Sequence, residues 1–196
     1  NGIDADMFRP QPQIEREPFH LITTASADQP LKGTQHLIPA VALLAKRFPK
    51  LKLTFIGAPK AGGATEQAIK KHDLQSRITF HHGISPEQIV DLYALASVAV
   101  VPSEYEGFGL PAGEAMACGV PLVSTDGGAL PEVVGDAGLV VPAKDSQALA
   151  EAIACLFNDP TRCAQLGSAG RARIVQNFSW RQCALEMTSF YNEVIA

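Results

Sequence analysis

Short apolar runs alternate with amphipathic stretches along most of this chain, and that alternation restricts its fold more than any other feature of the sequence. Six runs rich in Val, Ile, Leu and Phe have the length and composition of strands buried on both faces. They cover residues 19–25, 51–57, 77–83, 98–101, 121–125 and 138–141. Helical patterns lie between them over residues 34–48, 65–72, 86–96 and 131–134, with a further short helix beginning near Pro111. Because parallel strands joined by helices form right-handed crossovers, the sequence predicts an α/β fold with a doubly wound, Rossmann-like parallel sheet.

The composition fits one ordinary domain. With 196 residues, 46% of them hydrophobic and 18% charged, the chain can bury a substantial core. Three more helices are expected at its end, over residues 145–157, 160–176 and 180–195. No apolar run approaches the roughly 20 residues of a membrane-spanning helix. A formal net charge of −4 argues against a surface that binds nucleic acid.

The four cysteines, Cys118, Cys155, Cys163 and Cys183, form no Cys-x-x-Cys pair. Their spacing suits neither a zinc site nor a disulfide framework. We therefore expect buried or partly buried thiols in the reducing environment of the cytoplasm.

The stretch over residues 103–121 carries the clearest functional signal. It follows the apolar run 98–101, and its glycines lead into a helix with Pro111 in the first turn, where a missing N–H costs little. A strand, a glycine-rich loop and a helix N-terminus together point free backbone N–H groups and a positive dipole end at a phosphate. Glu106 and Glu114 would weaken phosphate binding here unless they accept hydrogen bonds from neutral hydroxyls, such as those of a ribose and a sugar. The stretch therefore predicts a site for a sugar nucleotide.

These two glutamates, with seven residues between them around Gly-Phe-Gly-Leu, resemble the Glu-x7-Glu signature of retaining glycosyltransferases with the GT-B fold. The sequence over residues 114–121 and Leu-Pro-Glu-Val over 130–133 is also similar to the glycosyl transferases group 1, glycogen-synthase-like family. The resemblance covers nearly the whole chain. It implies the C-terminal, donor-binding half of a GT-B fold. The enzyme would move a hexose from a nucleoside diphosphate sugar, such as a UDP- or GDP-hexose, to a hydroxyl acceptor, without a metal or another cofactor.

The same resemblance implies a division of the chain. Residues 1–18, which are rich in proline and polar side chains, would be the interdomain linker, and residues 19–178 the nucleotide-sugar-binding, Rossmann-like domain. Residues 179–196 would form a C-terminal helix that packs toward an N-terminal, acceptor-binding domain, which we expect upstream of Asn1. Peripheral association of the parent protein with a membrane stays open.

By resemblance, two residues are predicted to be catalytic. Lys32, at the turn after the first strand, is similar to the pyrophosphate-binding lysine of the family, and Glu106 would contact the donor sugar near the reacting carbon. The family commonly has an arginine five or six residues before that lysine, where this chain has Ala27 and Ser26. Neutralisation of the phosphates is therefore expected to rest on Lys32 and the helix N-terminus, or on a residue of the missing half.

Further residues are predicted to hold the donor. By resemblance, Glu114 would bind the ribose hydroxyls. The base would lie against Gly83 and Ile84 at the carboxyl end of the third strand. The loop residues expected to cradle the phosphates are Gly107, Phe108, Gly109 and Leu110. No metal site is predicted, since the site region contains no Asp-x-Asp pair.

Other interpretations stay open. The glycines could serve only a tight turn, and a lysine at such a turn is often simply solvated. A sugar-nucleotide-binding module without turnover would use the same residues. A GT-B sugar-nucleotide epimerase is a further alternative, although it is less similar around Gly-Phe-Gly-Leu. The sequence does not determine the donor base, the donor sugar or the acceptor.

Overall fold

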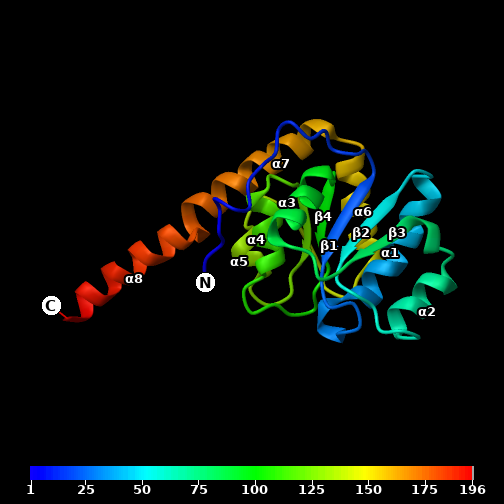
Figure 1. Ribbon diagram of the computed structural model, residues 1–196, viewed down its shortest axis with the longest axis horizontal. Coiled ribbons are helices and arrows are strands. Elements are labelled where there is room, and N and C mark those ends of the chain that lie inside the picture. The colour runs from blue at the N-terminus through cyan, green and yellow to red at the C-terminus, as the bar shows by residue number, and fades with distance from the viewer. Residues whose placement is uncertain (196) are drawn as a thin grey trace.

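A computed structural model describes residues 1–195 of the chain. Six parallel strands form one sheet in the order β3-β2-β1-β4-β5-β6, with helices on both faces (Figure 1). The strands are β1 (His20–Thr24), β2 (Lys52–Ile56), β3 (Ile78–His81), β4 (Val98–Val101), β5 (Leu122–Thr125) and β6 (Leu139–Val141). This order confirms the predicted doubly wound, Rossmann-like sheet.

The helices follow the strands as the apolar periodicity predicts. They are α1 (Thr34–Arg47), α2 (Ala64–Lys71), α3 (Pro86–Leu95), α4 (Leu110–Ala117), α5 (Leu130–Val134), α6 (Ser146–Phe157), α7 (Pro160–Arg173) and α8 (Trp180–Ile195). Most boundaries lie within two residues of the predicted ones. The helix predicted over 160–176 instead changes after Arg173 into a π-helical turn over Ile174–Phe178. Short 3₁₀ turns at Pro30–Lys32 and Gln75–Arg77 had no signal in the sequence.

Local capping explains why several helices begin where they do. The Ser85 side chain accepts a hydrogen bond from the Gln88 backbone N–H, and the Gln88 side chain accepts one from the Ser85 backbone N–H. This capping box and Pro86 at the first helical position fix the start of α3, as the sequence predicted. Asp145 and Asp159 cap α6 and α7 by single N-cap side chains, whose carboxylates accept hydrogen bonds from backbone N–H groups of the first turn.

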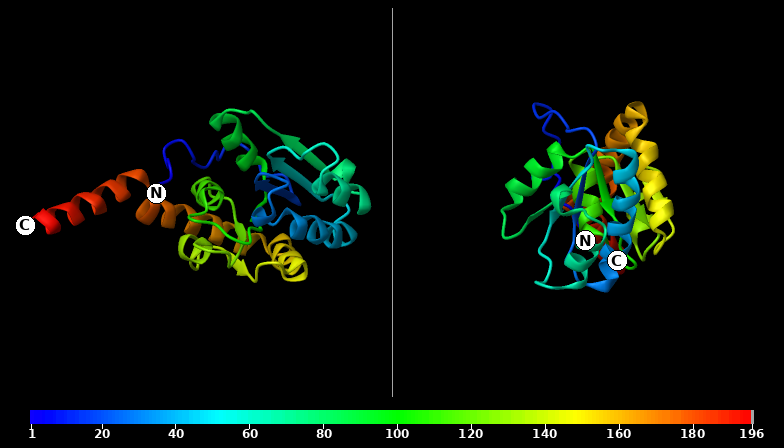
Figure 2. Two further views of the ribbon diagram at one scale, coloured as in Figure 1. Left: turned by 90° about the horizontal axis from the view of Figure 1, so that it is seen from below. Right: turned by 90° about the vertical axis from the view of Figure 1, so that its right-hand side faces the viewer.

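Helices cover both faces of the sheet (Figure 2), and an apolar layer on each face holds them there. Successive strand residues point to opposite faces, so Leu21 and Leu53 pack under α1 and α6. Ile22 and Val101 pack on the other face, under α3, α4 and α5. All of these side chains are at most 4% exposed. Burial on both faces explains the continuous apolar runs from which the strands were predicted.

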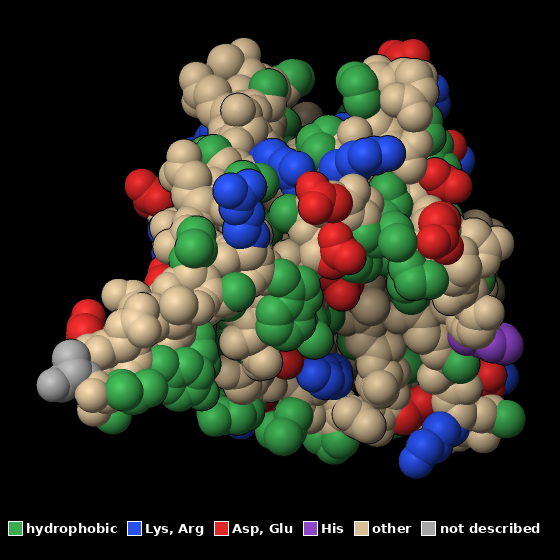
Figure 3. Space-filling view, turned by 60° about the vertical axis from the view of Figure 1, so that its left-hand side comes forward, with side chains coloured by type: hydrophobic (Ala, Val, Ile, Leu, Met, Phe, Trp, Pro, Cys, Tyr) green, Lys and Arg blue, Asp and Glu red, His purple; other side chains and the backbone are tan. Residues whose placement is uncertain are grey.

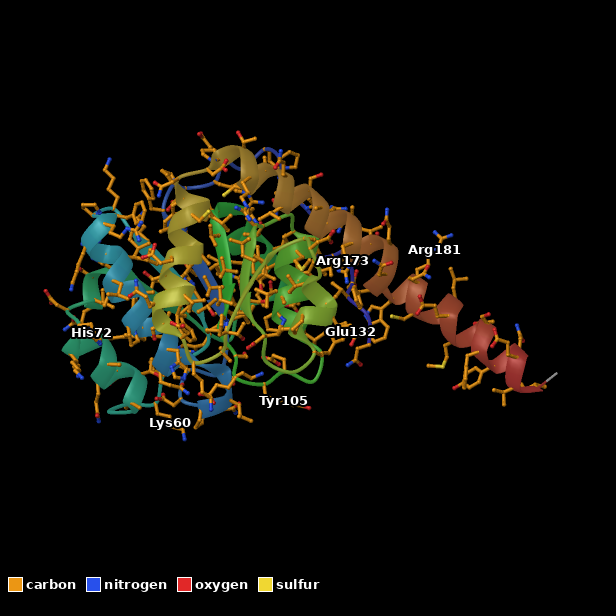
Figure 4. All side chains as sticks on the ribbon, turned by 180° about the vertical axis from the view of Figure 1, so that it is seen from behind. Lys60, His72, Tyr105, Glu132, Arg173 and Arg181 are labelled. Atoms are coloured by element: carbon orange, nitrogen blue, oxygen red, sulfur yellow. The ribbon has the colours of Figure 1, made fainter. Side chains whose placement is uncertain are left out.

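Three arginines hold the ends of helices to distant parts of the chain. Arg16 donates hydrogen bonds to backbone carbonyls at the carboxyl ends of α3 and α4, and Arg171 donates to carbonyls of Ala5, Phe8 and Ala117. Arg173 donates to the carbonyls of Glu132 and Val133 in α5, which ties α7 to that helix (Figure 4). A cation at the carboxyl end of a helix is favourable because that end carries a partial negative charge. Residues 1–18 therefore lie fixed against the body of the protein.

Helix α8 projects away from the sheet (Figures 1 and 4). It buries none of its residues, and the large apolar side chains that it exposes are Trp180, Leu185, Met187, Phe190, Tyr191, Val194 and Ile195. Hydrophobic side chains line its visible side in Figure 3. Within residues 1–195, no helix is long and apolar enough to cross a membrane. The final residue of the segment predicted over 179–196 lies outside the described residues.

All four cysteines are free thiols. Cys118 is buried, and Cys163 and Cys183 are partly buried. Cys155 is exposed on α6, so the prediction of a buried or partly buried thiol was wrong for this residue. Its neighbours Ile153, Ala154 and Leu156 occupy the face of α6 that is directed into the core.

Candidate functional site

The site lies at the carboxyl edge of the sheet, between β1 and β4. These two strands are neighbours, yet the chain continues from β1 toward β2 and β3 on one side and from β4 toward β5 and β6 on the other. The loops that leave them must therefore separate, which opens a crevice of the kind in which doubly wound sheets bind ligands. The left panel of Figure 2 shows the protein from the side of these loops.

The loops after β1 and β4 touch each other through their backbones at the edge of this crevice. Gly33 has a φ of +69°, and a Cβ atom there would overlap the carbonyl group of Pro102. The backbone N–H of Glu104 donates to the carbonyl of Leu31 at 2.8 Å. Only glycine allows this conformation and this approach together. The lysine at the end of the first loop is thereby held beside the glutamates of the second.

Lys32 and Glu106, the two residues predicted to be catalytic, form an ion pair. The distance from Lys32 Nζ to Glu106 Oε1 is 2.9 Å, and Ser103 Oγ donates to the same oxygen at 2.8 Å. Glu106 is 8% exposed, whereas the lysine side chain is about 29% exposed. No residue of the described chain donates a hydrogen bond to Oε2. One carboxylate oxygen is thus fixed by two donors, and the other has none from the described chain.

A second carboxylate in the same loop anchors it to the rest of the domain. Glu104 lies 2.9 Å from both His36 Nε2, in α1, and Lys144 Nζ, in the turn after β6. The Lys144 ammonium, and then His36, lower the pKa of Glu104. Tyr105 comes next and is directed toward solvent (Figure 4). Glu104 therefore joins its loop to α1 on one side and to the turn after β6 on the other.

The turn after β5 supports the loop from the other side. Thr125 Oγ1 donates a hydrogen bond to the carbonyl of Ser103, and the backbone N–H of Ala129 donates to the carbonyl of Glu106 at 2.9 Å. Gly128, with a φ of +63°, leaves no room for a Cβ atom beside the backbone of Glu106. The turn after β5 thus positions the loop that carries Glu106.

The first turn of α4 faces the crevice without a side-chain cap. Gly109 is its N-cap residue with a φ of +94°, and no side chain accepts a hydrogen bond from the first backbone N–H groups. These groups and the positive end of the helix dipole are therefore free for an anion. Gly107 borders open space, and Leu110 is exposed, whereas the Phe108 ring packs against Phe178 with its centroid 5.9 Å away. The predicted cradle is thus made of backbone, and Phe108 anchors it.

Glu114 lies one turn inside α4 and is partly buried. Burial raises the pKa of its carboxyl group to about 7. No described residue donates a hydrogen bond to this carboxylate or neutralises its charge, since burial alone causes the shift. A partly buried carboxylate without a donor is costly for the protein by itself. Hydroxyl groups of a ligand would supply the missing donors.

A cavity of about 390 Å³ opens beside these groups. It is lined by Thr24, Ala25, Ser26, Lys32, Ile56, Gly57, His81, His82, Gly83, Ile84, Ile89 and Pro111. The structure thus places Lys32 and both residues predicted to contact the base around one cavity. Gly83 has a φ of +64°, and open space surrounds the position of its missing Cβ. Three larger hollows, of about 740, 570 and 500 Å³, have none of the predicted site residues in their walls.

Besides Thr125, Gly128 and Lys144, sequence reasoning missed four residues that support this site. Ser103 was within reach of prediction, because it lies three residues before Glu106 at the end of a strand. The others, Thr24, His36 and Tyr93, gave no signal. Each acts through a partner about 70 positions away in the sequence, such as His36 on Glu104 and Tyr93 on Thr24.

Several known proteins are similar to this chain over most of its length. A family model described as "Glycosyl transferases group 1" matches residues 6–173. The MMP alpha-(1->4)-mannosyltransferase of Mycolicibacterium hassiacum is 40% identical over 199 residues, which cover 100% of this chain and 47% of that protein. The chain thus spans about half the length of the curated relatives that it matches.

Two solved structures are similar over nearly the whole chain. One is the C-terminal domain of a glycosyl transferase group 1 family protein (LpcC) from Francisella tularensis, with 27% identity and a TM-score of 0.77. The match covers 91% of this chain and 100% of that domain. The other is Anabaena Alr3699/HepE in complex with UDP-glucose, with 25% identity and a TM-score of 0.82. That match covers 96% of this chain and 56% of the Anabaena chain.

Proposed function

Because this chain belongs to the family of glycosyl transferases group 1, we propose that it is the nucleotide-sugar-binding, C-terminal half of a retaining glycosyltransferase. The complete enzyme would transfer a hexose from a nucleoside diphosphate sugar to a hydroxyl acceptor. One observation carries this proposal. Lys32 forms an ion pair with Glu106 at the crevice between β1 and β4, where the free N-terminus of α4 also lies. Glu114, one turn inside this helix, has a partly buried carboxylate that no described residue neutralises.

In this proposal the diphosphate binds between Lys32 and the first turn of α4. An ammonium group has three donors, so Lys32 can keep its hydrogen bond to Glu106 and still donate to a phosphate oxygen. The backbone N–H groups that follow Gly109 supply further donors and a partial positive charge. These groups provide positive charge at the diphosphate without a metal, although the arginine common in the family is replaced by Ser26 or Ala27.

The nucleoside would extend from the diphosphate into the cavity of about 390 Å³. Glu114 would accept hydrogen bonds from the ribose hydroxyls, which relieves the cost of its burial. Gly83 and Ile84 would contact the base. A relative named as a mannosyltransferase and a similar structure with bound UDP-glucose support a nucleoside diphosphate hexose as donor. They leave the choice of base and sugar to experiment.

Glu106 would bind the hexose through Oε2, because Lys32 and Ser103 already occupy Oε1. As the glycosidic bond breaks, negative charge develops on the departing diphosphate, and Lys32 lies in a position to stabilise it. The acceptor would attack from the same face of the sugar, with retention of configuration. A fixed carboxylate contributes mainly by orienting the hexose.

The other half of the enzyme would close over this edge and supply the acceptor site. The exposed apolar side of α8 supports such a contact, since Trp180, Met187, Tyr191 and Val194 recur at helical spacing along it. Closure would exclude water from the donor and so favour transfer over hydrolysis. The free thiols favour a reducing compartment such as the cytoplasm.

Calorimetric titration of this chain with UDP and GDP tests the proposal. We expect weak but saturable binding of at least one of them, since half of the cleft is present. Lys32→Ala should weaken it roughly thirtyfold, because an ammonium near 4 Å from a phosphate is worth ~4 kcal/mol at an effective dielectric near 20, and about half remains after desolvation. Uridine and guanosine lack phosphates, so the unmodified protein and Lys32→Ala should bind each of them with equal affinity.

Lys60→Ala is the matched control, because this lysine is exposed in the loop after β2 and its side chain forms no ion pair with a described residue (Figure 4). It should bind as the unmodified protein does. Absence of binding by either nucleoside diphosphate at millimolar concentration would overturn the proposed function. Equal losses in the two lysine variants would instead show that the effect of Lys32 is non-specific charge.

A further inference from the structure

Tyr93 is a buried titratable residue to which the proposed chemistry gives no role. It lies in α3 and is only 1% exposed, although a phenol is costly to bury unless its hydroxyl is hydrogen-bonded. That hydroxyl lies 3.1 Å from Thr24 Oγ1 and 3.4 Å from the carbonyl oxygen of Pro111. The Phe8 ring meets the tyrosine ring edge-on with its centroid 6.5 Å away. The side chain is therefore held at both ends.

The two hydrogen-bond partners belong to the two sides of the crevice. Thr24 is the last residue of β1, and Pro111 is in the first turn of α4. Both line the cavity of about 390 Å³, so the Tyr93 hydroxyl lies directly behind its wall. Since Thr24 and Pro111 are 87 positions apart in the sequence, this hydroxyl joins the end of one strand to the helix that follows the other.

Glu114 lies three residues after Pro111, in the next turn of α4. Burial, and then the nearby charge of Glu114, raise the pKa of Tyr93 well above its usual value. The phenol therefore keeps its proton at every physiological pH and remains a hydrogen-bond donor. A phenylalanine would fill the same volume in the core and could not make this connection.

We propose that Tyr93 is a positioning residue for the nucleotide: its hydroxyl fixes the first turn of α4, and with it Glu114, against the end of β1. The inference rests on the proposed function, because it takes Glu114 to be the group that binds the ribose. Tyr93 itself does not touch the ligand. Its effect is transmitted through the position of α4.

Tyr93→Phe tests this role, because it removes one oxygen and keeps the ring. We expect the affinity for the nucleoside diphosphate that binds best to fall about three- to tenfold, the range of one hydrogen bond. In a Glu114→Gln background the same change should cost less than twofold, because its effect passes through Glu114. Tyr191→Phe, on the exposed side of α8, is the matched control and should change nothing.

The outcomes separate this inference from the proposed function. If the unmodified chain binds no nucleoside diphosphate, the proposed function fails before Tyr93 is tested. If it binds and Tyr93→Phe binds equally well, the positioning role is overturned. An equal loss in the Glu114→Gln background would overturn it too, since the effect would then bypass Glu114. Should Tyr93→Phe fail to fold, Thr24→Val removes the partner hydroxyl, and unchanged affinity in that variant would also refute the role.

Discussion

Replacing Glu114 by glutamine should stabilise the protein and weaken its binding of nucleotide. The carboxylate is partly buried, and no described residue donates a hydrogen bond to it, so its pKa rises from the usual 4.5 to about 7. The folded protein therefore holds this proton more tightly than the unfolded chain does. As the pH rises from about 4.5 to about 7, the charge of Glu114 makes the folded state progressively less stable, and above that range the cost is constant.

The magnitude follows from the same shift. One pKa unit corresponds to about 1.4 kcal/mol, which sets an upper limit of roughly 3 kcal/mol for the cost of the charge. Because the carboxylate is not fully buried and water screens it, we expect about half of that, or ~1.5 kcal/mol. Glu114→Gln keeps the size and polarity of the side chain without its charge. The free energy of unfolding of the variant should therefore exceed that of the unmodified protein by about 1.5 kcal/mol at pH 8 and by almost nothing at pH 4.

Urea unfolding of both proteins between pH 4 and pH 8 measures this difference. Titration with the nucleoside diphosphate measures the opposite effect, since a charge-assisted hydrogen bond contributes about 1.5–3 kcal/mol. We expect affinity at pH 8 to fall roughly ten- to a hundredfold in the variant. Below pH 7 the nucleotide affinities of the two proteins should converge. Titration of the ligand's own phosphate affects both proteins equally, so the comparison with the variant corrects for it.

Two results would refute this reasoning. Equal stability of the two proteins at pH 8 would mean that the carboxylate is compensated within the chain. A nucleotide affinity unchanged by Glu114→Gln would mean that the buried charge does not serve ligand binding. Glu132→Gln, at an exposed position on α5, provides the control and should alter neither quantity.

Two further predictions concern the frame around the site and the exposed helix. Gly33→Ala should destabilise the protein by more than ~3 kcal/mol in urea unfolding, because the added Cβ meets the Pro102 carbonyl. Gly62 has the same φ of +69° but open space around it, so Gly62→Ala should cost only about 1–2 kcal/mol. Equal losses of stability in the two variants would show that backbone strain, and not the contact with Pro102, causes the loss. Phe190→Glu on α8 should change stability by no more than about 0.5 kcal/mol, whereas Leu37→Ala in the core should cost roughly 2–5 kcal/mol. A large loss from Phe190→Glu would show that α8 already packs on this chain.

Much of the fold could be predicted from the sequence, because its signals are local. Strands buried on both faces need continuous apolar runs, and helices on a sheet need apolar residues every three or four positions. The start of α3 at Pro86 was predicted correctly, because its cap also acts locally, between Ser85 and Gln88. The 3₁₀ turn over Pro30–Lys32 was harder to predict, because a single turn is too short to show a periodic pattern in the sequence.

The sequence by itself determined which residues could form the candidate site. The Glu-x7-Glu pattern, the glycines before α4 and the lysine after β1 are all short patterns that resemble a known family, and the family match confirms that resemblance. It also determined that these groups lie at one edge, since the carboxyl ends of parallel strands meet there. It gave no information on how the groups contact one another.

Only the tertiary structure decided those contacts. Lys32 and Glu106 are 74 positions apart and form an ion pair because Gly33 lets two backbones touch. Tyr93 reaches Thr24 across 69 positions, and Glu114 is left without a donor because of what packs around it. Such contacts depend on the distances between elements, and side-chain packing sets those distances to within about an ångström. A pattern of residue types along the chain records which side chains are available, and packing decides which of them meet.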